Sequence, residues 1–406
     1  MKQKPMQGVK VIELGQLIAG PFAGKFFAEF GAEVIKIEPP AVRTPDGPKG
    51  GGDPLRTWRK LHNGTSLWWH VQSRNKKSLT LDLRRPEGQE IARELCRDAD
   101  VVIENFRPGT LEKWSIGWEQ LSAINPRLVM LRLSGFGQTG PMRDLAGFGS
   151  VAEAMGGMRY VTGFPDRPPV RINLSIGDAL AAMHGVIGVL MALRHRDQVS
   201  GRGQVVDVAL YEAVFNMMES TLPEFDATGE IRERTGSNLT GIVPSNTYHS
   251  KDGKHVVIGA NGDSIFKRLM TLMGREDLGN DPALANNAGR SLRAQELDEA
   301  IGAWTRQHDA DPLVAMLNVA QVPNGKIYSI ADIVNDPQYI ARDMIRTVKL
   351  DDGMALKVPG IVPKLSETPG DIDAPGPALG QHTDELLRGL GYDPARIAAL
   401  KESGVI

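Results

Sequence analysis

The sequence predicts an α/β protein with an open, mostly parallel sheet in its larger part and a mixture of strands and helices in a smaller part. Over the first 135 residues, apolar runs rich in Val, Ile and Leu alternate with segments of helical periodicity. This order is typical of parallel strands joined by crossover helices. Near residue 220 the pattern changes to a hairpin followed by amphipathic helices. A chain of 406 residues can hold one large domain or two ordinary ones.

The first elements follow from the points where the apolar runs begin and end. The run at 9–14 ends at Gly15, the next helical segment carries small and aromatic residues on one face, and the second strand is stopped by Pro39 and Pro40. Pro86 suits the first turn of a helix. We therefore expect strands over 9–14, 33–38, 78–83, 100–106 and 128–134, with helices over 18–32 and 86–99.

The remaining elements are read in the same way. Residues 41–66 are rich in Gly, Pro and Arg and are expected to form a long functional or partner-contacting loop. The segment 178–196 is the strongest helix, with Asp178 as its N-cap and a basic last turn. A strand and a helix should follow within 203–220. A hairpin around Asp252-Gly253 then precedes helices over 263–320, and a strand and a helix close the chain.

Composition excludes several classes of protein. The formal net charge of −2 gives no overall basic field, so a nucleic-acid partner is not expected. Cys96 is the single cysteine, which rules out an intrachain disulfide and a multi-cysteine zinc site, and we interpret it as a packing residue. The N-terminal residues MKQKPMQG lack a long apolar segment, so neither a signal peptide nor a membrane span is expected there. The predicted location is the cytoplasm.

The stretch SGFGQTGP at 134–141 raises the question of a dinucleotide site. Gly135, Gly137 and Gly140 fit the pattern G-x-G-x-x-G after an apolar strand. A dinucleotide loop should come early and lead directly into a helix, whereas this match follows at least four strands and is soon interrupted by more glycines. The pattern is therefore weak support for an NAD enzyme, which an absorbance assay for the nicotinamide would detect.

Six stretches in order resemble the class III CoA-transferase family (CaiB/BaiF type), which includes formyl-CoA:oxalate and carnitine CoA-transferases and α-methylacyl-CoA racemase. They are IAGPFAGKFFAEFGAEVIKIEPP, NKKSLTLDLRRPEG, ADVVIENFRPG, SGFGQTGP, SIGDALAAMHGVIGVLMALRHRDQVSGRGQVVDVALYEA and ALGQHTDELL. The resemblance implies a Rossmann-like large domain whose first part is 1–224, a small α+β domain at 225–330, and a segment at 331–406 that returns to the large domain. It also implies an interlocked homodimer.

Asp178 matches the catalytic aspartate of this family. Transfer of CoA between carboxylates requires a nucleophile that can form acyl intermediates. The resemblance implies that this aspartate forms first a mixed anhydride and then an aspartyl-CoA thioester, with no metal and no permanently bound cofactor, because the CoA thioester is the substrate. A purely structural N-cap role is the alternative. The two roles are compatible, since a helix N-terminus favours the ionised carboxylate.

Two other functions stay open beside the transferase. Racemases of the family carry a histidine base soon after the SGFGQTGP-like loop, and Phe148 occupies that position here, where it cannot accept a proton. His184 lies within an apolar helix and is interpreted as a packed or capping residue. A non-catalytic acyl-CoA-binding protein is the second alternative, and the retained Asp178 speaks against it.

The resemblance also assigns residues that bind CoA. They supply polar and basic groups for phosphates and apolar contacts for the pantetheine. The predicted set is Gln16, Ile18, Ala19, Leu81, Arg84, Asn105, Phe106, Arg107 and Lys113. A basic residue that relatives carry after the second strand is replaced by Pro39, so Arg43 or another residue of 41–60 must substitute for it, or one phosphate contact is missing.

The substrates are expected to be succinyl-CoA and a C4–C6 dicarboxylate. Some relatives carry a run of glycines as a lid where this chain has TGIVPSNTY, which argues against a close copy of the formyl-CoA:oxalate enzyme. The surrounding stretch and GQHTDELL resemble the succinyl-CoA-using branch. Itaconate, malate, citramalate, mesaconate and glutarate are the candidate acceptors. Phe148 and Arg171 are the candidate pocket residues, with Arg159 as a second choice to clamp the distal carboxylate, although Arg171 is equally well interpreted as a structural ion-pair partner.

Overall fold

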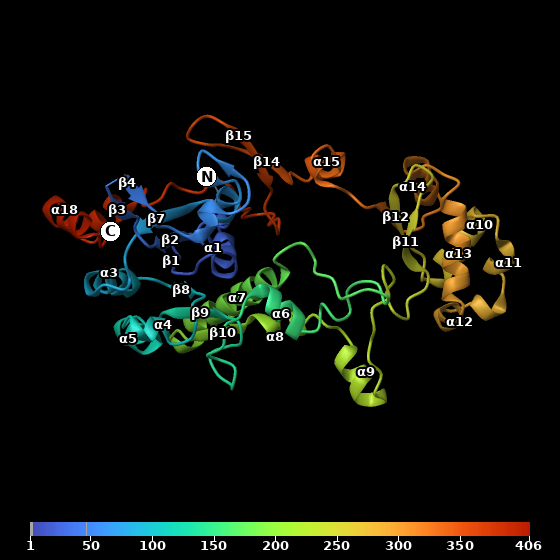
Figure 1. The fold of residues 1–406 in the computed structure, drawn as a ribbon, viewed down its shortest axis with the longest axis horizontal. Coiled ribbons are helices and arrows are strands. Elements are labelled where there is room, and N and C mark those ends of the chain that lie inside the picture. The colour runs from blue at the N-terminus through green and yellow to red at the C-terminus, as the bar shows by residue number, and fades with distance from the viewer. Residues whose placement is uncertain (1–2, 46) are drawn as a thin grey trace. The chain divides into compact units, whose positions relative to one another are not determined.

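The structure is a computed structural model that describes residues 3–45 and 47–406, without the side chains of residues 43, 47 and 48. The chain forms two compact units (Figure 1). The first runs to Met158 and adds Ile172–Glu219 and Ala341–Ile406, while the second comprises Arg159–Arg171 and Ser220–Ile340. The C-terminal segment therefore belongs to the first unit.

A six-stranded parallel sheet forms the centre of the first unit, in the order β10-β9-β8-β1-β2-β7. The strands are β1 (Lys10–Glu13), β2 (Glu33–Glu38), β7 (Lys76–Thr80), β8 (Val101–Glu104), β9 (Val129–Ser134) and β10 (Val205–Ala209). Val11 pairs with Val34 on one side and with Val101 on the other. The predicted α/β class with a parallel sheet is thus confirmed.

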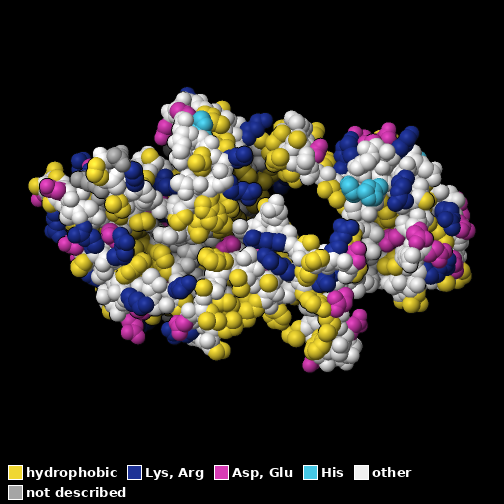
Figure 2. Space-filling model, in the orientation of Figure 1, with side chains coloured by type: hydrophobic (Ala, Val, Ile, Leu, Met, Phe, Trp, Pro, Cys, Tyr) yellow, Lys and Arg dark blue, Asp and Glu magenta, His cyan; other side chains and the backbone are white. Residues whose placement is uncertain are grey.

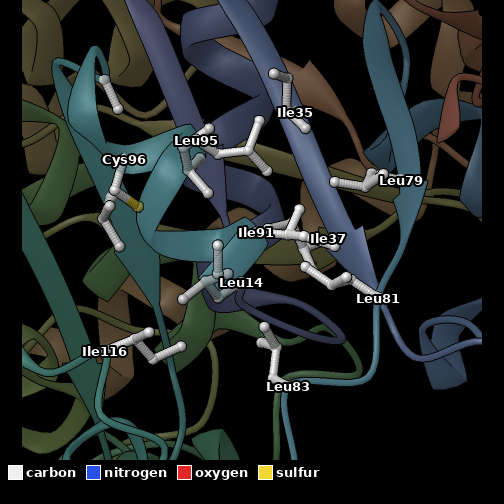
Figure 3. Packing of buried hydrophobic residues seen from close by; sticks show 14 of the residues in the cluster. Leu14, Ile35, Ile37, Leu79, Leu81, Leu83, Ile91, Leu95, Cys96 and Ile116 are labelled. Carbon is white, nitrogen blue, oxygen red and sulfur yellow. The ribbon is translucent and has the colours of Figure 1, made fainter. Parts of the chain in front are cut away.

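The central strands are apolar along their length because helices cover both faces of the sheet. Val11, Val34 and Val101 face α1 (Ala19–Glu29), α7 (Ile176–His195) and α8 (Leu210–Phe215) in one core cluster. The alternate residues Ile12 and Ile35 face a second cluster. That cluster is closed by α3 (Pro86–Arg97), α5 (Trp118–Ile124), α17 (Thr383–Gly389) and α18 (Pro394–Ser403). Figure 3 shows Ile91 and Leu95 of α3 beside Ile35 and Ile37, with Cys96 buried on the same helix.

The segment 41–66 is more regular than the sequence predicts. It holds two short antiparallel pairs, β3 (Val42–Thr44) with β4 (Gly47–Lys49) and β5 (Leu61–His62) with β6 (Thr65–Ser66), around a 3-10 turn at Pro54–Thr57. The other elements of the first unit are α2 (Trp69–Gln72), α4 (Thr110–Lys113), α6 (Gly149–Met155), a π-helical turn at Arg196–Ser200, and the hairpin of β14 (Ile345–Lys349) and β15 (Ala355–Pro359).

The predicted start of the long helix is wrong, and the strand expected over 78–83 lies earlier, as β7 (Lys76–Thr80). Helix α7 begins at Ile176 with Ser175 as its N-cap, so Asp178 lies in the first turn and not at the cap. The reason is that Ile176 and Gly177 continue the helix towards the N-terminus, where Gly177 packs closely against the backbone of Gly149. Together with the π-helical turn, α7 is long and apolar enough to cross a membrane by length and composition alone. It packs on β9, β10 and α1, as the core helix of a globular domain does, and is weak support for a membrane span.

The second unit has its own core. An antiparallel sheet of β11 (Ser245–His249), β12 (His255–Gly259) and β13 (Asn324–Lys326) contains the predicted hairpin, with Gly253 in its turn at a φ of +77°. Apolar residues such as Val256, Phe266 and Leu297 fill the space between the sheet and the helices. The helices are α9 (Thr221–Thr228), α10 (Asp263–Leu272), α11 (Glu276–Gly279), α12 (Asn287–Leu292), α13 (Ala294–Thr305), α14 (Ala310–Val319), α15 (Ile330–Ile333) and α16 (Pro337–Ala341), which runs into the first unit, with a 3-10 turn at Pro282–Leu284.

Candidate active site

A cleft of about 220 Å³ lies at the carboxyl ends of β1, β2, β7 and β8. Ligands of open α/β sheets bind at such an edge. Four residues of the predicted CoA set line it: Gln16, Leu81, Arg84 and Phe106. Leu14, Ile37 and Trp114 add apolar wall, and the rings of Phe106 and Trp114 meet edge to face with centroids 5.3 Å apart. The cleft thus offers one polar loop, one guanidinium and an aromatic corner.

Asn105 holds the loop between β1 and α1. Its Oδ1 accepts a hydrogen bond from the backbone N–H of Gln16, and its Nδ2 donates to the carbonyl of Gln16, both at 2.8 Å. The loop is tight, because a Cβ on Gly15 would lie 3.0 Å from the Cα of Gly20 and 3.1 Å from Asn105 Oδ1. Asn105 therefore fixes the shape of the loop, and its predicted direct contact with CoA stays a prediction.

The basic residues of the predicted set lie in different surroundings. Arg84 is exposed and makes a two-pronged ion pair with Asp82, with Nε–Oδ1 at 2.8 Å and Nη2–Oδ2 at 2.9 Å. This pair raises the pKa of Arg84 and lowers the pKa of Asp82. Arg107 and Lys113 are exposed, whereas Ile18 and Ala19 are buried at the start of α1. These last four are not among the described residues that line the cleft.

The missing basic residue after β2 is not replaced by Arg56. Pro39 itself lines the cleft. Arg56 turns inward and binds the buried Glu38 through Nε at 2.7 Å and Nη2 at 2.8 Å, while its guanidinium stacks 3.7 Å from the ring centre of Trp69. The side chain of Arg43 lies outside the described residues.

A buried acid lies beneath the turn that carries Asn105 and Phe106. Glu104 at the end of β8 accepts from the backbone N–H of Phe106 at 2.8 Å and from Arg132 Nε at 2.7 Å. Arg132 also binds Glu112 at 2.7 Å. Burial raises the pKa of Glu104 to about 7, although Arg132 opposes that shift. Sequence reasoning missed this group. Its signals are an arginine inside the apolar run LVMLRLS and an acid at the end of VVIE.

Asp178 lies close to the N-termini of two helices. It is in the first turn of α7, and its carboxylate packs on Gly149, the first residue of α6. A Cβ on Gly149 would lie 2.1 Å from Asp178 Oδ2, so only glycine leaves room for the carboxylate there. Unpaired N–H groups at helix N-termini favour negative charge. The position suits an ionised carboxylate.

The SGFGQTGP loop packs against the segment that leads to Gly149. A Cβ on Gly135 would lie 2.7 Å from the Cα of Gly147, two residues before Gly149. Gly137 and Gly140 have φ values of +86° and +84°, which glycine adopts without strain. Residues 141–148 form turns and no helix, so the loop does not open a helix as a dinucleotide fingerprint does. In the structure the loop leads into the segment that packs against Asp178.

The sequence model described as CoA-transferase family III matches residues 6–383. The chain belongs to this family. Succinyl-CoA–D-citramalate CoA-transferase of Chloroflexus aurantiacus is 51% identical over 405 residues, which cover 99% of this chain and 98% of the relative. The alpha subunit of succinyl-CoA–L-malate CoA-transferase of Chloroflexus aurantiacus is 41% identical over 96% of this chain and 89% of its own length. A crystal structure of a CAIB/BAIF family protein from Brucella suis superposes with a TM-score of 0.82 at 33% identity, covering 96% of this chain and 100% of that one.

As a family III CoA-transferase, the protein is an enzyme that uses CoA thioesters as substrates. Phe148, which the sequence resemblance aligns with a histidine of the racemases, is 68% exposed and is the N-cap residue of α6. Both ring nitrogens of His184 have partners: Nδ1 lies 2.8 Å from the carbonyl of Leu180, and Nε2 lies 3.3 Å from Asn216 Oδ1. These contacts agree with the predicted packing role of His184.

The candidates for binding the second carboxylate lie in the other unit. Arg171 is exposed and Arg159 is half-buried, and both belong to the segment 159–171 of the second unit. Asp178 belongs to the first unit. The clamp role of Arg171 therefore stays a prediction. In the described part of the chain no three His, Cys, Asp or Glu side chains gather as metal ligands.

Proposed function

We propose that the enzyme transfers CoA from succinyl-CoA to a C4–C6 dicarboxylate, with D-citramalate as the first acceptor to test. The observation that carries this proposal is the 51% identity, over 99% of this chain, to a relative named for succinyl-CoA and D-citramalate. The relative named for succinyl-CoA and L-malate supports the same class of 2-hydroxydicarboxylate. Itaconate, mesaconate and glutarate lack the 2-hydroxyl group and are further candidates as C5 dicarboxylates.

Asp178 is the proposed nucleophile. A carboxylate oxygen of Asp178 attacks the thioester carbon of succinyl-CoA, the C–S bond breaks, and CoA leaves as a thiolate from a mixed anhydride. The thiolate then attacks the aspartyl carbonyl, which releases succinate and leaves an aspartyl-CoA thioester. The acceptor carboxylate displaces the thiolate to form a second anhydride. Attack of the thiolate on the acceptor's carbonyl gives the new acyl-CoA and regenerates the Asp178 carboxylate.

Two features support this role for Asp178. The carboxylate lies at the first turn of α7 and next to the first residue of α6, where helix dipoles favour the ionised form that must attack. The glycine at 149 leaves the space that the carboxylate needs. In the proposed binding mode, part of CoA occupies the cleft lined by Gln16, Leu81 and Phe106. Phe148 and Arg171 are separate candidates for contact with the acid, and a guanidinium such as that of Arg171 suits a carboxylate.

A homodimer is the proposed assembly. Along α7, Met183, Ile187, Leu190 and Met191 are between 38% and 66% exposed and fall on one stripe of the helix. Figure 2 shows hydrophobic side chains gathered where Figure 1 places α7 and α8. A contiguous apolar patch of this kind marks an interaction surface.

The test is a mass-spectrometric assay with succinyl-CoA and a pool of dicarboxylic acids. We expect citramalyl-CoA and free succinate with the wild type and neither with Asp178→Asn. If a different acyl-CoA forms, the proposed acceptor is wrong and succinyl-CoA stays the proposed donor. Absence of any product with every acid would refute succinyl-CoA as the donor, and equal activity of Asp178→Asn would refute the nucleophile.

A further inference from the structure

Lys36 lies at the centre of a buried charge cluster below the loop that carries Gln16. Its side chain on β2 is 1% exposed. The ammonium lies 3.0 Å from Glu13 Oε1, 2.9 Å from Asp53 Oδ2 and 2.7 Å from the carbonyl oxygen of Gly15. An ammonium has three N–H donors, so these acceptors use its full capacity. One of them is the backbone of the Gln16 loop itself.

Leu17 in the same loop has an uncommon backbone conformation. Its φ is +63°, the left-handed region that a branched residue rarely adopts and that costs free energy. The N–H of Leu17 points between the two carboxylate oxygens of Asp53, at 3.0 Å and 3.1 Å. Asp53 thus compensates the strained residue directly and is bound in turn to Lys36.

Asp53 reaches this place through a turn of three glycines. Gly50, Gly51 and Gly52 have φ values of +66°, +82° and +73°. A Cβ on Gly51 would lie 2.5 Å from the backbone N of Ala41, whereas a Cβ on Gly50 would meet nothing within 4 Å. The backbone N–H of Asp53 then donates to Glu38 at 2.9 Å. The segment GGGD is therefore shaped to bring a carboxylate from the surface loop into the interior.

We propose that Asp53 and Lys36 are positioning residues for CoA transfer, which hold Gln16, Leu17 and Ile18 in the one loop conformation that suits the reacting thioester. The inference rests on the proposed function, because that function places part of CoA in the cleft that Gln16 lines. It gives the segment 41–66 a definite role. The alternative is that Asp53 only stabilises the fold, for example as the N-cap of the 3-10 turn, where it accepts from the N–H of Leu55 at 2.9 Å.

Two pairs of variants separate these readings. Asp53→Asn keeps the shape and loses the charge, and its control is Glu29→Gln, which weakens another buried ion pair, with Arg74, where Nε–Oε1 is 2.7 Å. Gly51→Ala moves the turn and keeps every charged group, and its control is Gly50→Ala. The measurements are kcat and KM for succinyl-CoA and amide hydrogen exchange of the peptide that contains Leu17.

We expect Asp53→Asn and Gly51→Ala to lower kcat about 10- to 100-fold, since a loop displaced by about 1 Å costs that much. Exchange at Leu17 should rise about tenfold or more in both, because Asp53→Asn loses the ion pair with Lys36 that holds the side chain and Gly51→Ala displaces the turn that carries it. Both controls should match the wild type in kcat, because neither changes a group that holds the Gln16 loop. If Asp53→Asn fails to fold, Gly51→Ala and its control still decide.

Unchanged exchange at Leu17 in Gly51→Ala, or equal losses of kcat in the variants and their controls, would overturn the positioning role. Hydrogen exchange does not need a substrate. If the wild type transfers no CoA while hydrogen exchange rises only in the Leu17 peptide of the variants, the proposed function fails. The structural role of Asp53 in holding the Leu17 loop then stands. If the wild type is active and hydrogen exchange at Leu17 is the same in all variants and the wild type, the positioning role of Asp53 fails and the proposed function stands.

Discussion

A single methyl group on Gly149 is predicted to disable the enzyme and leave the fold intact. In Gly149→Ala the new Cβ would lie 2.1 Å from Asp178 Oδ2 and 2.9 Å from its Cγ. Real Cβ contacts essentially never fall under 3.0 Å, so the carboxylate oxygen has to withdraw by about 0.9 Å. The moving atom is the end of a side chain, so the stability cost should stay below about 1 kcal/mol.

The expected kinetic effect is much larger than this stability effect. Misplacing a reacting group by about 1 Å costs about 100-fold in rate, or about 2.7 kcal/mol in the activation barrier. We would measure exchange of labelled succinate into succinyl-CoA, which needs the donor half-reaction alone, and the thermal midpoint by circular dichroism. The matched control is Gly389→Ala at the end of α17, where a Cβ meets nothing within 4 Å.

Wild-type exchange by Gly149→Ala would show that the position of the Asp178 carboxylate does not limit the reaction, since the carboxylate could then move without consequence for the chemistry. A loss of exchange matched by a large fall in the thermal midpoint would also contradict the prediction, because the defect would then be one of folding. The expected pattern is a loss of about 100-fold with a nearly unchanged midpoint. The Gly389→Ala control should match the wild type in both measurements.

Three further predictions concern stability, assembly and reactivity. Burial raises the pKa of Glu104 to about 7 from an ordinary value of 4.5, so the folded state holds this proton more tightly than the unfolded state. The free energy of unfolding should therefore fall as pH rises from 4.5 to about 7, and urea titrations of Glu104→Gln should show a smaller fall. Identical pH profiles of the wild type and Glu104→Gln would contradict this expectation. Met191→Glu, at a side chain that is 66% exposed, should halve the mass measured by light scattering if the α7 stripe forms the dimer contact, whereas a wild-type monomer of 44.1 kDa would refute the dimer. Burial raises the pKa of the Cys96 thiol to about 12, so iodoacetamide should modify Cys96 only after denaturation, and rapid labelling of the native protein would be inconsistent with its burial.

The central sheet could be predicted because its inner strands β1, β2, β8 and β9 are buried on both faces. Runs such as VKVIEL and LVMLRLS are nearly continuous in apolar residues, and the helical pattern between them leaves parallel pairing as the simple solution. The start of α7 could not be placed to the residue. The N-terminal extension through Ile176 and Gly177 depends on tight packing of Gly177 on Gly149, a contact between distant parts of the chain.

Some residues of the candidate site could also be predicted from the sequence, and others could not. Asp178 and the residues of the cleft occur in local motifs, so a resemblance finds them. The buried charges do not: Lys36 lies in the strand EVIKIE, and its burial makes sense only with Asp53 from a surface loop and the carbonyl of Gly15. Likewise the inward turn of Arg56 depends on Glu38 and Trp69. Such groups are set by three-dimensional neighbours that no local pattern specifies.

Asp178 would be identified as the nucleophile most directly by detecting the covalent intermediate that it forms. Wild-type enzyme would be mixed with succinyl-CoA, quenched in acid, digested and analysed by mass spectrometry. We expect CoA attached as a thioester to the peptide that contains Asp178, with release of succinate and no adduct in Asp178→Asn. An adduct on another residue, or active enzyme with no adduct at any time point and full activity in Asp178→Asn, would contradict the assignment of Asp178 as the nucleophile.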